Sequence, residues 1–136
     1  MFTFLPSVLL ALAFLAPITA PVIEKEGRVT FSNVTPGDLG KDSTSDSVRQ
    51  FPVKIMMSSE SGIPYGGVFV RIFDHAGGLV FKHLCEKPWL YLKLPMGNYN
   101  VIAVDRKKSL QMAPFFVKDS SQKIIKLKWP KSIVGY

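Results

Sequence analysis

The chain has 136 residues, a length typical of a single domain, and a formal net charge of +7. It contains one cysteine, Cys85, and two histidines, His75 and His83. A single cysteine excludes an internal disulfide, and two histidines leave little material for a metal site. A domain of this size can bury a sound core without either kind of support.

The N-terminal segment Met1–Ala20 predicts export. It carries no charged side chain, and its apolar part from Leu5 to Ala16 has the length of the hydrophobic region of a secretory signal. The small residues Thr19 and Ala20 offer a processing site. An uncleaved membrane anchor is the alternative, because no basic residue precedes the apolar run and Pro21 would follow the cut. We therefore expect a periplasmic or secreted protein, or one tethered to the membrane by this segment.

Residues 21–50 are predicted to form a polar, flexible lead with at most one short strand. The strand candidate is Arg28–Ser32, in which Val29 and Phe31 alternate with polar neighbours. Glycines and prolines punctuate the remainder of the lead, which favours loop structure. Asn33-Val34-Thr35 matches a glycosylation sequon, a tripeptide that is common by chance.

Short apolar runs separated by turn residues begin at Phe51. Seven runs have strand character: 51–57, 65–74, 79–85, 89–94, 99–105, 110–117 and 123–129. Their spacing is typical of a β-sandwich, and no stretch after Ala20 shows a sustained helical period. For residues 51–136 the sequence thus predicts an all-β fold, a seven-stranded antiparallel Ig-like or transthyretin-like β-sandwich.

Alternation within the runs predicts which side chains face the core. In the run 65–74, Val68, Val70 and Ile72 share one face. In the last run, the inward residues are Ile125, Leu127 and Trp129, whereas Lys126 and Lys128 point outward. Cys85 is expected to be a small buried side chain in a strand.

The segment 94–103 holds the most specific pattern, Leu94-Pro95-x-Gly97-x-Tyr99-x-Val-x-Ala. Proline and glycine suit a tight turn, and the Tyr99 hydroxyl can return to the turn backbone as in a tyrosine corner. Together with the run 68–74 and its glycine turn, this pattern resembles carboxypeptidase regulatory-like domains. These are transthyretin-like sandwiches related to the B-type repeats of collagen-binding adhesins, and Pro88-Trp89 resembles a subgroup of small exported bacterial proteins. The resemblance implies a binding accessory without catalytic residues to carry over.

The titratable residues do not suggest a catalytic centre. A nucleophilic Cys85 would need His83 or His75 as its base, and a metal on the two histidines would need Asp74 or Cys85 as a third ligand. Because Cys85 and His83 share a strand face with Phe81, a packing role is favoured. No catalytic residue, metal ligand or cofactor is predicted. Hydroxyisourate hydrolases have a transthyretin-like fold, but this chain lacks their C-terminal Tyr-Arg-Gly-Ser.

Positive charge gathers at the C-terminal end of the sequence. From Arg106 onward, eight Lys and Arg residues stand against one acid, Asp119. Such a surface attracts polyanions and anionic membranes. The candidate contacts with an anionic surface are Arg106, Lys107, Lys108, Lys126 and Lys128.

Three functions therefore compete on the sequence. The first is a non-catalytic exported accessory or binding domain with an unknown partner in the cell envelope. The second is binding of an anionic surface, lipid or polysaccharide, through the C-terminal basic residues. The third is a hydrolase on a transthyretin-like fold. A nucleic-acid partner is not expected, because no aromatic-interleaved basic motif is present, and the N-terminal segment adds a membrane partner only if it is retained.

Overall fold

The computed structural model describes residues 23–39, 50–119 and 121–130. Within them the chain forms one helical turn, α2 (Pro36–Leu39), and nine strands. The strands are β1 (Glu24–Glu26), β2 (Val29–Val34), β3 (Val53–Ser59), β4 (Val68–Asp74), β5 (Leu79–Cys85), β6 (Trp89–Leu92), β7 (Gly97–Val104), β8 (Leu110–Val117) and β9 (Lys123–Trp129). The predicted signal segment Met1–Ala20 lies outside the described residues. Among the residues that are described, no helix is long and apolar enough to cross a bilayer.

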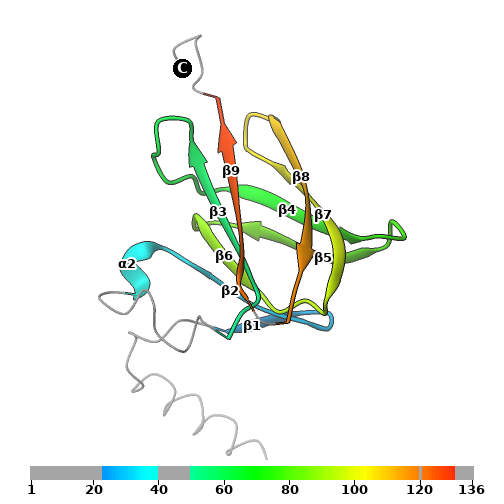
Figure 1. The fold of residues 1–136 in the computed structure, drawn as a ribbon. Coiled ribbons are helices and arrows are strands. Elements are labelled where there is room, and N and C mark those ends of the chain that lie inside the picture. The colour runs from blue at the N-terminus through cyan, green and yellow to red at the C-terminus, as the bar shows by residue number, and fades with distance from the viewer. Residues whose placement is uncertain (1–22, 40–49, 120, 131–136) are drawn as a thin grey trace, which may run out of the picture.

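The strands form two sheets that enclose one core (Figure 1). Sheet A has the strand order β1-β2-β6-β3-β9, and sheet B has the order β5-β4-β7-β8. Alternate side chains from both sheets meet in a single hydrophobic cluster. The all-β class and the sandwich-like packing of two sheets are thereby confirmed.

The number of strands was predicted wrongly, because nine strands replace the expected seven. Both additional strands lie in the lead of residues 21–50, where at most one short strand was expected. β2 is an inner strand of sheet A between β1 and β6, and it buries Val29 and Phe31. Its polar neighbours and its isolation from the later runs concealed this role in the sequence.

The expectation of a wholly antiparallel sandwich was also wrong. β9 pairs with β3 in parallel, with Val53 opposite Lys123 and Ser59 opposite Trp129. After β8 the chain passes from sheet B to sheet A, where β9 forms the edge strand next to β3. Both strands run in the same direction (Figure 1). Side-chain alternation has the same period in both kinds of pairing, so the sequence pattern does not reveal strand direction.

The predicted facing of the strands is confirmed. Val68, Val70 and Ile72 of β4 are fully buried, as is Cys85 of β5. On β9, Ile125, Leu127 and Trp129 are buried, while the lysines between them are exposed.

The tyrosine corner is present. The Tyr99 hydroxyl donates a hydrogen bond of 2.8 Å to the Pro95 carbonyl oxygen, and its ring stacks on Phe115 at 5.6 Å between centroids. Burial raises the pKa of the Tyr99 hydroxyl, which keeps it protonated and able to donate. The corner fixes the entry of the chain into β7.

A second polar cluster closes the opposite end of the core. The Tyr65 hydroxyl donates to Asp105 Oδ2 at 2.9 Å, and the Tyr65 ring stacks on Trp129 at 5.2 Å. Asp105 Oδ1 accepts from the backbone amides of Lys107 and Ser109, at 2.9 and 2.8 Å. The Trp129 indole in turn donates to the Ser109 carbonyl oxygen at 2.9 Å. These bonds fix the β7–β8 turn against the end of β9.

Replacing Tyr99 by phenylalanine should lower the free energy of unfolding by about 1 kcal/mol, because one net hydrogen bond is lost while the ring is kept. Urea denaturation monitored by tryptophan fluorescence measures the change. Asn100→Ala, at an exposed position of the same strand, is the control and should stay within about 0.5 kcal/mol of the unchanged protein. Equal stability of the two variants would contradict the role of the Tyr99–Pro95 bond.

Candidate functional site

The outward strand positions of sheet A combine cationic and apolar side chains. In sheet register the outward residues of β2, β6, β3 and β9 form rows across the strands. None of these described outward positions is Asp or Glu. They are Thr30, Ser32, Val34, Trp89, Tyr91, Lys54, Met56, Ser58, Ile124, Lys126 and Lys128. The charged side chains at these strand positions are therefore all cationic, whereas Glu60 of the adjoining β3–β4 loop is the acid beside the end of β9.

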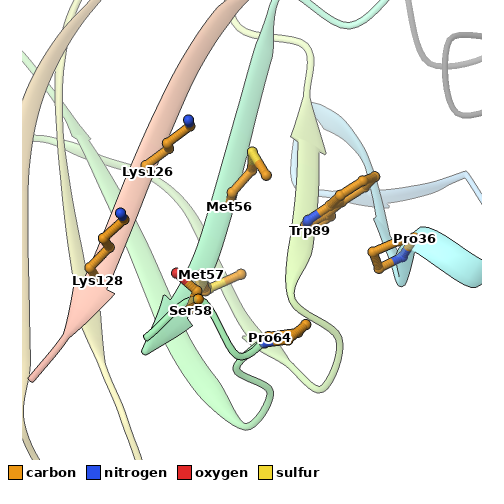
Figure 2. Close-up of a pocket in the computed structure, with 9 residues that line it drawn as sticks. Pro36, Met56, Met57, Ser58, Pro64, Trp89, Lys126 and Lys128 are labelled. Atoms are coloured by element: carbon orange, nitrogen blue, oxygen red, sulfur yellow. The ribbon is translucent and has the colours of Figure 1, made fainter. Parts of the chain in front are cut away.

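A groove of about 290 Å³ lies on this face, at the end of the sheet where β3 turns toward β4 (Figure 2). Strands β3, β6 and β9 form its floor, and α2 and the β3–β4 loop contribute to its border. The lining residues are Pro36, Met56, Met57, Ser58, Gly62, Pro64, Trp89, Lys126 and Lys128. The groove thus has an apolar wall on one side and two ammonium groups on the other, as Figure 2 shows.

The lysines owe their position to the parallel pairing of β9 with β3. Lys126 lies opposite Met56, and Lys128 lies opposite Ser58. Two residues of a parallel strand advance roughly 6.6 Å, so the two side chains leave the sheet side by side on one face. Both are exposed, and their ammonium groups can each donate to an anion in the groove.

Trp89 is held in place by a third lysine of the same face. The Lys54 ammonium lies 3.9 Å from the centroid of the Trp89 ring and 5.4 Å from that of Tyr91. Such cation–π contacts favour the charged lysine, whereas its burial lowers the pKa of Lys54. The Phe51 and Tyr91 ring centroids lie 5.9 Å apart, and Trp89 packs against the small apolar cluster that these two residues form with Val34. The exposed remainder of the indole is left to line the groove.

The five basic residues predicted as anion contacts fall into two groups. Lys126 and Lys128 border the groove, whereas Arg106, Lys107 and Lys108 lie on the β7–β8 turn of sheet B. Arg106 forms an exposed salt bridge of 3.1 Å with Glu86, so part of its charge is already neutralised. Its guanidinium lies over Gly67, where a Cβ atom would collide with it. The five residues thus come from both sheets, and two of them line the groove.

The residues weighed for nucleophilic or metal chemistry occupy separate places. The His83 ring packs on Phe31 at 4.6 Å inside the sandwich, whereas His75 is exposed at the tip of the β4–β5 hairpin. Asp74 Oδ1 accepts from the amides of Ala76 and Gly78 and closes that hairpin. Among the described side chains, no three His, Cys, Asp or Glu residues gather to hold a metal ion.

The sequon asparagine has a structural role. Asn33 Nδ2 donates to the carbonyl oxygens of Lys87 and Trp89, at 2.9 and 2.8 Å, and Asn33 Oδ1 accepts from the Lys87 amide at 3.2 Å. These bonds anchor the chain that leads into β6 and so position Trp89 beside the groove.

Sequence reasoning missed the apolar half of the site. Trp89 and Met56 were assigned to strands, but nothing in the sequence indicates that they are neighbours of Lys126. Only the strand order β6-β3-β9 brings the three together. The alternation of Lys126 and Lys128 with buried residues was the one available signal, and it located half of the groove.

Comparison with protein-family models gives no match, and comparison with curated proteins finds no similar sequence.

The Cys85 thiol should be unreactive in the folded protein. It is fully buried, its Sγ lies 4.0 Å from the His83 carbonyl oxygen, and burial raises the thiol pKa. Because the thiolate is the reactive form, folding should prevent alkylation near pH 8. Iodoacetamide labelling followed by mass spectrometry should give almost no adduct in buffer and complete labelling in urea. Rapid alkylation of the folded chain would contradict this assignment.

Proposed function

We propose that this protein is an exported, non-catalytic binding domain of the cell envelope that holds an acidic polysaccharide in the groove on sheet A. Its sandwich is of the Ig-like or transthyretin-like kind, and the tyrosine corner at Tyr99 supports a relationship to carboxypeptidase regulatory-like domains. The uncharged apolar segment Met1–Ala20 supports export.

The observation that carries the proposal is the pairing of two neighbouring lysines with an apolar wall. Lys126 and Lys128 supply two ammonium groups on one side of the groove, and Trp89 and Met56 supply apolar surface on the other. A sugar acid has both complementary parts. Its carboxylate can pair with ammonium groups, and the C–H faces of its ring can lie against an indole or a thioether.

The spacing of the cations supports a ligand with repeated acidic groups. Lys126 and Lys128 follow one another along β9 and both line the groove. Successive acidic units of a chain can meet successive lysines, so weak exposed contacts add through multivalency.

Titration calorimetry with polygalacturonate, a linear uronic-acid polymer, tests the proposal. The double variant Lys126→Ala, Lys128→Ala should bind about tenfold more weakly, since exposed ion pairs contribute about 0.2–1 kcal/mol each. Added salt should weaken binding by the unchanged protein, because exposed charges are screened.

The matched control is Lys82→Ala with Lys107→Ala, which removes the same charge from exposed positions outside the groove. It should retain most of the affinity. Equal losses in the two double variants would show attraction by net charge alone and refute the groove. Shortening of the polymer during the titration would refute the non-catalytic assignment.

A further inference from the structure

The outer face of sheet B is unusually apolar for an exposed surface. Strand register aligns its outward side chains in rows, so that Leu84, Phe69, Val104 and Leu110 follow one another across all four strands. The next row contains Lys82, Arg71, Ile102 and Met112. Large apolar side chains on this face are substantially exposed: Phe69 38%, Phe116 41%, Leu84 48%, Leu110 50% and Met112 64%.

This arrangement is a continuous patch, since directly opposed residues of neighbouring strands have Cβ atoms about 4.5–5.5 Å apart. Scattered exposed apolar residues are ordinary, but a contiguous apolar patch marks a surface that meets a partner or a membrane. Phe73 and Pro114 extend the same patch toward the far end of β4 and β8. The outer face of sheet A differs, because its outward positions on β3 and β9 include three lysines, Lys54, Lys126 and Lys128.

The charged residues at the outward strand positions of this face are cationic. Its outward strand positions include two cations, Arg71 and Lys82, and no acid. Lys108 precedes β8, and Lys118 follows it next to Asp119. Glu86, beyond the end of β5, is paired with Arg106 at 3.1 Å. A partner that covers this face must therefore provide both an apolar layer and negative charge.

Arg71 is a cation of the inner strand β4 on this face. Its Nε atom is buried and makes no hydrogen bond, and its guanidinium lies 5.8 Å from the Phe69 ring. The guanidinium charge thus stands beside the apolar patch, where it can pair with an anionic partner.

We propose that the outer face of sheet B docks on an anionic lipid bilayer. The Leu, Phe and Met side chains enter the boundary between headgroups and acyl chains, while Arg71, Lys82 and the flanking lysines meet lipid phosphates. A second copy of this chain fits the face less well. Face-to-face pairing would bring Arg71 and Lys82 near the same residues of a copy that also carries a net charge of +7.

The proposal concerns a different surface from the polysaccharide groove and does not depend on it. The two faces lie on opposite sides of the sandwich (Figure 1). Docking through sheet B would therefore leave the groove on sheet A directed away from the membrane.

Site-specific fluorescence on the full chain tests the proposal. An environment-sensitive fluorophore is attached to Met112→Cys and, as the matched control, to Ile124→Cys on the outer face of sheet A, where the native side chain is 49% exposed. Cys85 is buried, and the unchanged protein serves as the labelling blank. With phosphatidylglycerol vesicles, emission from position 112 should shift to the blue and intensify, while emission from position 124 should stay constant. Phosphatidylcholine vesicles should give a much smaller response.

A second pair of variants measures the contribution of the patch to affinity. Met112→Glu should weaken vesicle partition about tenfold, because it removes an apolar contact and adds a charge of the same sign as the lipid. Ile124→Glu adds the same charge on the opposite face and should have a small effect. Circular dichroism confirms that both variants are folded.

Five results would overturn the proposal. No response at position 112, or equal responses at positions 112 and 124, would show that this face does not meet the bilayer. A blue-shifted signal at position 112 before vesicles are added, with a dimer in light scattering, would assign the face to a second copy. The same signal in a monomer would assign it to another segment of this chain. Binding of an acidic protein that leaves vesicles unbound would assign it to a protein partner.

Discussion

The parallel docking of β9 on β3 is the interaction on which the remaining structure depends. Ile125, Leu127 and Trp129 enter the core from one face of β9, and burial of each large apolar side chain contributes about 1.5–3 kcal/mol. Trp129 also connects the two sheets, because it stacks on Tyr65 and donates to Ser109 at the end of sheet B. The opposite face of the same strand presents Lys126 and Lys128 to the groove. Core closure and the candidate binding site are therefore two consequences of one strand pairing.

Local signals in the sequence located much of the fold and less of the site. Period-two alternation identified the buried faces of β4 and β9, and the Leu94–Tyr99 pattern identified the corner that the Tyr99–Pro95 bond closes. The direction of β9 and the place of β2 inside sheet A depend on long-range pairing, which alternation does not encode. Alternation along β9 identified Lys126 as an outward residue. Met56 and Trp89 share its row across the sheet only because of long-range strand pairing, so the sequence did not place them in the site.

The two outer faces of the sandwich differ in the chemical character of their exposed side chains. Sheet A presents lysines around an apolar wall, which suits a ligand that alternates carboxylates with apolar ring faces. Sheet B presents Leu, Phe and Met around Arg71, which suits an anionic lipid bilayer, whose charged headgroups cover an apolar interior. Because the two faces point in opposite directions, both proposed ligands can bind at the same time. The domain would then connect an envelope polysaccharide to a membrane. The turns closed by the Asp74 and Asp105 carboxylates lie outside the groove lining and hold the ends of the strands together.

The most direct test of this account is flotation of phosphatidylglycerol vesicles with fluorescent polygalacturonate and the full chain. The account predicts that the polymer floats with the vesicles only when the protein is present. It also predicts that the polymer is lost from the floating fraction with either Met112→Glu or the Lys126→Ala, Lys128→Ala pair, whereas Met112→Glu still binds polymer in solution. Displacement of the protein from vesicles by the polymer would contradict the account, because it would mean that both anions compete for one surface.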